Sequence, residues 1–178
     1  RDRYVRADAF ETGDSWSFDV QHFLDDGKGY DKACNFVEYR TGLVYTVYLQ
    51  SLDGHAIEGA LDSLYAHARD QYGWHVRHLW SDSAPQFPHN AEIADAWCRR
   101  HHVVFERSPP HQHYRNSRAE NANKTLARNT ILFLASGRLP IKYWRYAHSH
   151  AVYIYNVTPL GDASTSSPLH QAMPHQPM

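Results

Sequence analysis

The order in which strand and helix patterns follow one another is the feature that most constrains the fold of this chain. Residues 15–23, SWSFDVQHF, alternate apolar and polar side chains, as a strand with one buried face does. The runs 33–40 and 43–51 are rich in strand formers, and the short turn between them at Thr41 and Gly42 predicts a β-hairpin. We therefore expect three neighbouring antiparallel strands at the start of the chain.

The rest of the chain alternates helices with short strands. Apolar residues recur at helical spacing over residues 55–73, 90–102, 116–137 and 141–157, and short apolar runs at 74–82 and 103–108 predict two further strands. These last two strands are reached through helices, the usual connections between parallel strands. The order predicts an α/β fold in which a mixed five-stranded sheet is flanked by helices on both faces.

Length and composition indicate one folded domain. The chain has 178 residues, of which 42% are hydrophobic and 21% charged, which suffices for a hydrophobic core and is unlike a disordered segment. We expect a lead-in over residues 1–14, the folded core over 15–158 and a Pro- and Ser-rich linker over 159–178, all within a longer polypeptide. Cys34 and Cys98 are too far apart in sequence for a CxxC zinc site. No apolar run approaches the roughly 20 residues that cross a bilayer, so no membrane partner is expected.

Three carboxylates stand where a catalytic site could form. Asp19 lies inside the first strand, Asp82 at the end of the fourth and Glu120 in the first turns of the long helix. If the first and fourth strands are neighbours in the sheet, the two Asp side chains meet, and a helix crossing the strand ends brings Glu120 alongside. Converging carboxylates repel one another unless a cation joins them. Mg²⁺ takes oxygen ligands, and two such ions about 4 Å apart promote an in-line displacement at phosphorus.

Each carboxylate also has an ordinary structural explanation. Asp19 fits a half-exposed polar position in a strand, and Asp82, between two serines, fits a helix-capping turn. Glu120 stands four residues before Lys124, and a helical ion pair of this spacing is worth roughly 0.3–0.5 kcal/mol. The residues taken singly leave both interpretations open.

Basic residues gather around the third carboxylate. From residue 99 to residue 128 there are seven Lys or Arg and two acidic residues, whereas the net charge of the whole chain is −1. A local basic run is either a solvated surface or a surface for a polyanion. The residues near Glu120 that could contact nucleic acid are Tyr114, Arg115, Asn116, Arg118, Lys124 and Arg128. The fourteen His residues, His111 and His113 among them, fit scattered surface or core positions better than a zinc site without Cys.

Four strings in the sequence resemble one known family. They are WSFDV, LWSDSAPQF, SPPHQHYRNSRAENANKTL and LPIKYWRYAHSHAVYIYNVTP. They are similar to the integrase catalytic core of copia-type LTR retrotransposons, within the retroviral integrase and RNase H-like superfamily, and the resemblance runs from about Ser15 to the end. It implies that Asp19, Asp82 and Glu120 are the catalytic triad and the ligands of two Mg²⁺ or Mn²⁺ ions, and that Lys124 contacts DNA.

The resemblance also implies a function. Cores of this family are polynucleotidyl transferases and endonucleases that carry out DNA integration, because they process the 3′ ends of element DNA and join them to target DNA. The expected partners are therefore DNA and further copies of the chain, and the expected cofactor is Mg²⁺ or Mn²⁺. The expected location is the nucleus, with a cytoplasmic particle stage.

The sequence departs from the family in one spacing and in two loops. Asp82 and Glu120 are separated by 37 residues, where the family usually has 35. The family's Asp-Asn-Gly-Gly turn is replaced by DSAPQ over residues 82–86, and the Gly before Ala-Glu is replaced in the region of Ser117 and Arg118. Gly permits backbone conformations that Ser, Ala and Pro do not, so these changes affect the loops around the triad. Two alternatives follow: an inactive or domesticated core that acts as a DNA-binding module, and a different RNase H-like nuclease.

Overall fold

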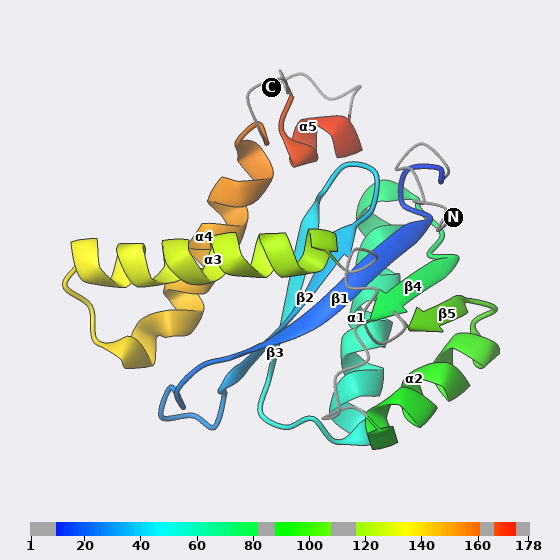
Figure 1. The fold of residues 1–178 in the computed structure, drawn as a ribbon, viewed down its shortest axis with the longest axis horizontal. Helices are drawn as coiled ribbons and strands as arrows, with labels where there is room; N and C mark the ends of the chain where they lie inside the picture. The colour runs from blue at the N-terminus through cyan, green and yellow to red at the C-terminus, as the bar shows by residue number, and fades with distance from the viewer. Residues whose placement is uncertain (1–9, 82–87, 108–116, 161–165, 174–178) are drawn as a thin grey trace.

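The computed structural model describes residues 10–81, 88–107, 117–160 and 166–173 (Figure 1). The strands are β1 (Ser15–His22), β2 (Lys32–Glu38), β3 (Val44–Leu49), β4 (His78–Ser81) and β5 (Val104–Arg107). The helices are α1 (Gly54–Tyr72), α2 (Pro88–Arg100), α3 (Ser117–Ser136), α4 (Trp144–Val157) and α5 (Pro168–Ala172), with a 3-10 turn, η3 (Ile141–Tyr143), before α4. The predicted order of strands and helices is confirmed up to α4.

The strands form one mixed five-stranded sheet in the order β3-β2-β1-β4-β5. The central strand β1 is antiparallel to β2 and parallel to β4, while β3 and β5 form the two edges. This arrangement confirms the predicted fold class. The predicted convergence of Asp19 and Asp82 required the first and fourth strands to be neighbours. They are neighbours, with Phe18 on β1 opposite Ser81 on β4.

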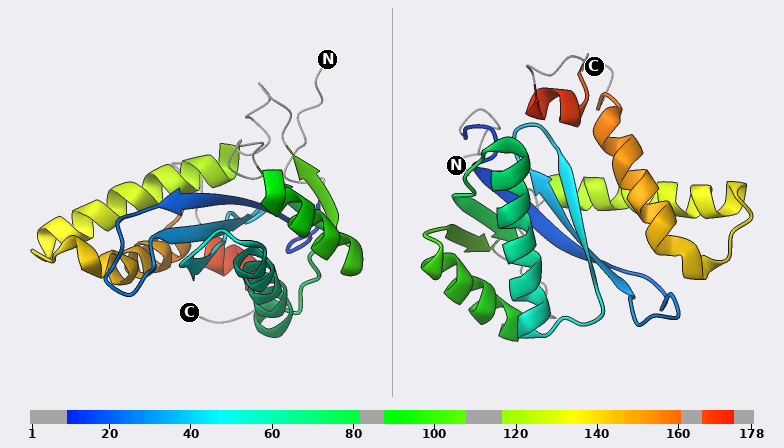
Figure 2. Two further views of the ribbon diagram at one scale, coloured as in Figure 1. Left: turned by 90° about the horizontal axis from the view of Figure 1, so that it is seen from below. Right: turned by 180° about the vertical axis from the view of Figure 1, so that it is seen from behind.

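Helices cover both faces of the sheet (Figure 2). Helix α1 lies on one face and α3 on the other, with α4 packed beside α3. Since side chains alternate along a strand, β1 directs Trp16 and Phe18 towards the α1 face and Asp19 and Gln21 towards α3. The alternation read from residues 15–23 thus separates an apolar face of the central strand from a polar one.

Helix α4 is tied to the edge strand β3. Asn156 accepts a hydrogen bond from the Val44 backbone N–H at 2.9 Å and donates one to the Val44 carbonyl at 2.8 Å. Its side-chain amide therefore pairs with β3 as a neighbouring strand would, which covers part of an edge that could otherwise pair with another chain. At the other end of the helix, Trp144 stacks on Phe23 with ring centroids 4.1 Å apart.

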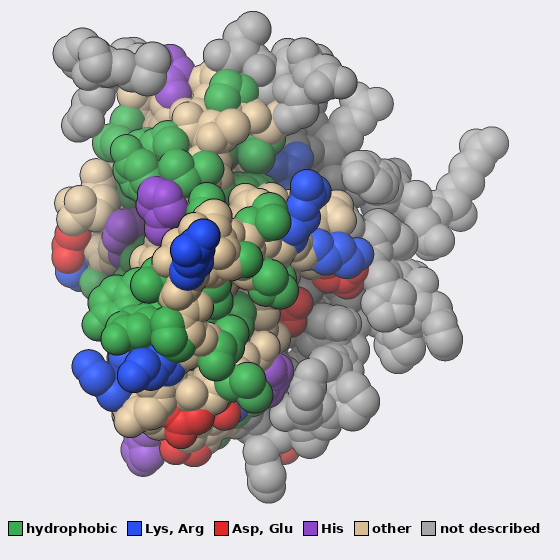
Figure 3. All heavy atoms as spheres, turned by 90° about the vertical axis from the view of Figure 1, so that its left-hand side faces the viewer, with side chains coloured by type: hydrophobic (Ala, Val, Ile, Leu, Met, Phe, Trp, Pro, Cys, Tyr) green, Lys and Arg blue, Asp and Glu red, His purple; other side chains and the backbone are tan. Residues whose placement is uncertain are grey.

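The outer surface of α3, α4 and the segment that joins them is rich in apolar side chains. Figure 3 views this side of the molecule, where hydrophobic side chains gather between a few Lys and Arg groups. We call the following exposed residues the α3–α4 apolar surface: Ile131, Leu132, Leu139, Ile141, Tyr143, Tyr146 and Tyr153. Gathered apolar side chains on a surface often mark an interaction site. Across the described ranges, no helix combines the length and the hydropathy that crossing a membrane requires.

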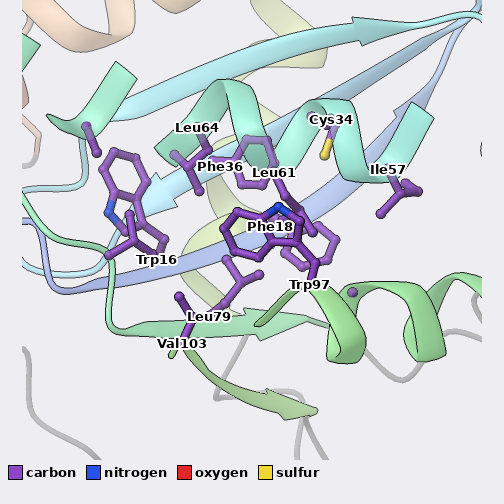
Figure 4. Packing of buried hydrophobic residues seen from close by; sticks show 14 of the residues in the cluster. Trp16, Phe18, Cys34, Phe36, Ile57, Leu61, Leu64, Leu79, Trp97 and Val103 are labelled. Carbon is purple, nitrogen blue, oxygen red and sulfur yellow. The ribbon is translucent and has the colours of Figure 1, made fainter. Parts of the chain in front are cut away.

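The main hydrophobic core lies between the sheet and α1 (Figure 4). Asp53 caps the start of α1 by accepting a hydrogen bond from the Ala56 N–H at 2.9 Å, and Gly73 ends the helix with a φ of 68°. Between these ends, the apolar stripe of the helix faces the sheet, so that Leu61 lies in the same buried cluster as Phe18. The core thus holds the central strand from the side opposite to Asp19.

Two segments differ from the sequence-based expectation. The strand predicted over 74–82 begins only at His78, and Trp74 instead stacks on Tyr72 with ring centroids 4.3 Å apart. Within the predicted linker 159–178, the structure has α5, whose Ala172 is 8% exposed and belongs to the main core cluster. So short a helix is stabilised by its tertiary contacts, which periodicity does not reveal. The domain boundary at residue 158 stays a prediction.

His148 on α4 is fully buried and couples the fold to pH. Its Nδ1 lies 3.2 Å from the Tyr48 hydroxyl, and its Nε2 has no hydrogen-bond partner within the described residues. Burial lowers the pKa of His148 from 6.5 to about 4. Between these values the unfolded chain binds a proton that the folded chain does not, so the free energy of unfolding falls as the pH drops.

We predict that His148→Leu removes part of this pH dependence. From pH 7 to pH 5, the free energy of unfolding of the wild type should fall by about 2 kcal/mol more than that of the variant. Denaturant unfolding followed by tryptophan fluorescence at both pH values measures the difference. His75→Leu, at an exposed position, is the control and should keep the wild-type slope. Equal slopes for the wild type and His148→Leu would contradict the assignment.

Candidate active site

Asp19 occupies the centre of the sheet on the face that α3 covers. The side chain is half-buried, and both of its oxygens accept hydrogen bonds. Oδ1 accepts from the Val20 backbone N–H at 2.8 Å, and Oδ2 accepts from Nδ2 of Asn123 at 2.9 Å. These bonds hold the carboxylate in one orientation, which an ordinary solvated strand position would not require.

Asn123 joins α3 to two strands of the sheet. The residue is only 7% exposed, and its Oδ1 accepts a hydrogen bond from Nδ2 of Asn35 on β2 at 2.7 Å. Its backbone carbonyl accepts a further bond from Nε2 of Gln21 on β1 at 3.1 Å. Together with the bond to Asp19, these contacts fix both the position and the rotation of the first turns of α3.

Glu120 lies one helical turn before Asn123. Residues three apart share a side of a helix and are separated by about 4.5 Å along its axis, so Glu120 lies on the part of α3 that is joined to Asp19. Its carboxylate is partly exposed and stands in the first turn, where a helix favours a negative charge. In the described part of the molecule, no ion pair within 4.0 Å joins Glu120 to Lys124.

Asp82 lies outside the described residues, as do Tyr114, Arg115 and Asn116. The parallel register nevertheless bears on Asp82, because Phe18 on β1 lies opposite Ser81 on β4. In the sequence, Asp19 follows Phe18 and Asp82 follows Ser81. The place of Asp82 in the site stays a prediction.

The donor set fits Mg²⁺ or Mn²⁺ in its chemistry. Asp19 and Glu120 offer carboxylate oxygens, the ligands that these ions prefer. Cys34 on β2 is buried in the main core cluster on the α1 side of the sheet, so its thiol does not face this site. Of the residues that the structure describes, no three His, Cys, Asp or Glu form a group that could hold a metal ion. The predicted third carboxylate, Asp82, lies outside the described residues.

The described basic residues divide between the two flanks of α3. Lys124 and Arg128 are exposed and follow Glu120 at four-residue steps, which places them on the same flank of the helix. Arg118 is half-buried instead, and its guanidinium carbon lies 5.0 Å from the centroid of the Tyr39 ring. Lys124 and Arg128 are therefore the described cations best placed to meet a ligand beside Glu120.

Three residues of the site were not singled out by the sequence analysis. They are Asn123, Asn35 and Thr46, which form a chain of hydrogen bonds leading to Asp19. Thr46 donates to Oδ1 of Asn35 at 2.6 Å. The available signal was a polar Asn inside the otherwise apolar strand ACNFV, on the same side of the sheet as Asp19. A buried polar side chain needs a partner, so such a residue points to a polar contact across the fold.

Comparisons with known proteins identify the fold. No protein-family model matches the chain, and no curated protein matches it. Among solved structures, the simian T-cell lymphotropic virus intasome in complex with the PP2A regulatory subunit B56 gamma matches with a TM-score of 0.70 and 18% identity. That match covers 93% of this chain and 55% of the other, so the chain spans about half the length of that neighbour.

Two isolated catalytic cores match along nearly their whole length. The catalytic core domain of BIV integrase has a TM-score of 0.65 and 18% identity, over 91% of this chain and 95% of that one. The HTLV-2 integrase catalytic core domain in complex with magnesium, in its dimeric form, has a TM-score of 0.61 and 18% identity, over 90% and 97% of the two chains. The chain therefore has the fold of retroviral integrase catalytic cores.

Proposed function

We propose that this chain is the catalytic core of a copia-type retrotransposon integrase, a polynucleotidyl transferase that processes element DNA ends and joins them to target DNA. One observation carries the proposal: Asn123 donates a hydrogen bond to Asp19 at 2.9 Å and so holds the turn that bears Glu120 against the central strand. Two members of the predicted triad, 101 positions apart in the chain, are thereby joined through one helical turn. The parallel pairing of β1 and β4 supports the third, Asp82.

Each residue of the site has a role in this proposal. Asp19, Asp82 and Glu120 would hold two Mg²⁺ or Mn²⁺ ions, which supply charge neutralisation at the phosphorus undergoing displacement. Asn123 keeps the Asp19 carboxylate turned towards the site. Lys124 and Arg128, with Tyr114, Arg115, Asn116 and Arg118, would hold DNA phosphates and set the register of the strand without reading its sequence.

The proposal extends to partners and location. The proposed DNA partners are the element ends and the target, and the proposed location is the nucleus with a cytoplasmic particle stage. The HTLV-2 neighbours, which are dimeric and trimeric forms of a catalytic core, support self-association as a further property. We assign this association to the α3–α4 apolar surface, which a second copy of the chain would cover.

Substitution of the triad tests the catalytic proposal. Asp19→Asn or Glu120→Gln should lower Mg²⁺-dependent strand transfer by at least about 100-fold, because each change removes a charged metal ligand. The control is Asp70→Asn, an exposed carboxylate on α1 across the sheet, which should keep full activity. Wild-type activity in either triad variant would rule out the proposal. DNA binding by the wild type without any Mg²⁺-dependent cleavage would favour the alternative of an inactive DNA-binding module.

Salt titration tests the DNA contact. Lys124→Gln should weaken binding to DNA of any sequence. It should also reduce the slope of the logarithm of the binding constant against the logarithm of the salt concentration by about one, the change expected for one lost phosphate contact. Fluorescence anisotropy with labelled duplex at several salt concentrations measures both quantities. Arg69→Gln removes an exposed cation from α1, on the far side of the sheet, and should leave the slope unchanged. A slope for Lys124→Gln equal to that of the wild type would remove Lys124 from the DNA-binding surface.

Self-association is tested by placing a charge in the apolar surface. Leu132 is 50% exposed on α3, and Leu132→Glu should raise the dissociation constant between copies by at least about tenfold. Sedimentation velocity over a range of protein concentrations measures this change. Val104→Glu is a matched control, because Val104 is 49% exposed but lies on β5 at the opposite edge of the sheet. Equal dissociation constants for both variants would place the contact elsewhere.

A further inference from the structure

Three polar residues lie side by side across the sheet beneath α3. The strand register places Asp19 on β1 directly opposite Asn35 on β2, and Asn35 directly opposite Thr46 on β3. Asn123 from α3 reaches down to this row and bonds to both Asp19 and Asn35. The row therefore runs from an edge strand to the central carboxylate of the candidate active site.

The hydrogen bonds of this row have one direction. The Thr46 hydroxyl donates to Oδ1 of Asn35 at 2.6 Å, so Asn35 presents its Nδ2 to Oδ1 of Asn123 at 2.7 Å. Asn123 must then present its own Nδ2 to Asp19, and it does so at 2.9 Å. An ionised carboxylate only accepts hydrogen bonds, whereas an amide can turn either its oxygen or its nitrogen towards a partner. A hydroxyl can donate or accept, so the acceptor-only carboxylate of Asp19 sets the direction of the row. The Thr46 hydroxyl stabilises that direction by donating to the Oδ1 that Asn35 turns towards it.

Stability alone does not account for this row. Asn35 is completely buried and Asn123 is 7% exposed. Burying an amide costs free energy that its hydrogen bonds at best return, and apolar side chains of similar size would serve a core equally well. The same face of β2 carries Ala33 and Val37, both buried in apolar clusters. Asn35 is therefore a polar insertion at the one position of the strand that faces Asp19.

We propose that Thr46, Asn35 and Asn123 form a positioning relay that orients Asp19 as a metal ligand and holds the Glu120 turn of α3 in register with it. This inference rests on the proposed function, because it takes Asp19 and Glu120 as ligands of Mg²⁺ or Mn²⁺. Thr46 and Asn35 are positioning residues, since they act on Asp19 only through Asn123. A change at Thr46, on the edge strand, should therefore weaken metal binding at the centre of the sheet.

The experiment compares three hydroxyl variants in the full chain. Thr46→Val keeps the shape of the side chain and removes the hydroxyl, whereas Thr46→Ser keeps the hydroxyl. Tyr45→Phe is the matched control, because the neighbouring Tyr45 hydroxyl bonds to Ser63 at 2.7 Å on the α1 side of the sheet. The Mn²⁺ dissociation constant, measured from the electron paramagnetic resonance signal of free Mn²⁺, and the denaturant midpoint are determined for each variant.

The relay predicts a change in metal affinity that a loss of stability would not produce. Thr46→Val should raise the Mn²⁺ dissociation constant by about threefold to tenfold, in line with the loss of one buried hydrogen bond. Thr46→Ser should stay close to the wild type, and Tyr45→Phe should lower the denaturant midpoint without changing Mn²⁺ affinity. Wild-type affinity in Thr46→Val, or equal weakening in Tyr45→Phe, would overturn the relay.

Asp19→Asn in the same titration separates this inference from the proposed function. If the wild type binds Mn²⁺ and Asp19→Asn does not, the proposed metal site is supported. The Mn²⁺ affinities of the Thr46 variants then test the relay by itself. If the wild type binds no Mn²⁺, or if Asp19→Asn binds it equally well, the proposed metal site is wrong and the relay is overturned with it.

Discussion

The hydrogen bond from Asn123 to Asp19 is the contact on which the arrangement of this site depends. Helix α3 approaches the sheet through Ala119 and Ala122, whose small side chains allow close packing but do little to fix rotation or sliding. The directional bond at 2.9 Å supplies what these apolar contacts lack. Because Glu120 lies one turn away from Asn123, the same bond sets where the second carboxylate stands relative to the first.

The two faces of the central strand β1 make different kinds of contact. On the α1 side, Trp16 and Phe18 are buried in the main core and stabilise the sheet. On the α3 side, Asp19 and Gln21 take part in polar contacts with α3 that carry the proposed chemistry. A rigid apolar face behind a polar one restricts the movement of Asp19, which a site built around metal ions needs. Successive residues of β1 therefore contribute in alternation to the core and to the proposed site.

The sequence predicted the sheet well and the contacts within the site less well. Alternation in β1 assigned Asp19 to the face opposite Phe18, and the hairpin and helical crossovers predicted a mixed sheet, because these features are local patterns. The bond between Asn123 and Asp19 joins residues 104 positions apart, and no local pattern encodes it. The same holds for α5, whose five residues are stabilised by tertiary packing. The triad itself was predicted from the resemblance of whole strings, since each carboxylate alone had an ordinary explanation.

The buried polar row also bears on the choice between an active core and a DNA-binding module. A module that only binds DNA needs exposed cations such as Lys124 and Arg128, which lie on the outer flank of α3. It does not need Asn35, a completely buried amide whose bonds lead to Asp19 through Asn123. Orienting a carboxylate this strictly serves a ligand with fixed geometry, and Mg²⁺ with its octahedral shell is such a ligand. The internal polar contacts of the chain therefore favour the catalytic proposal, although the basic surface fits both functions equally.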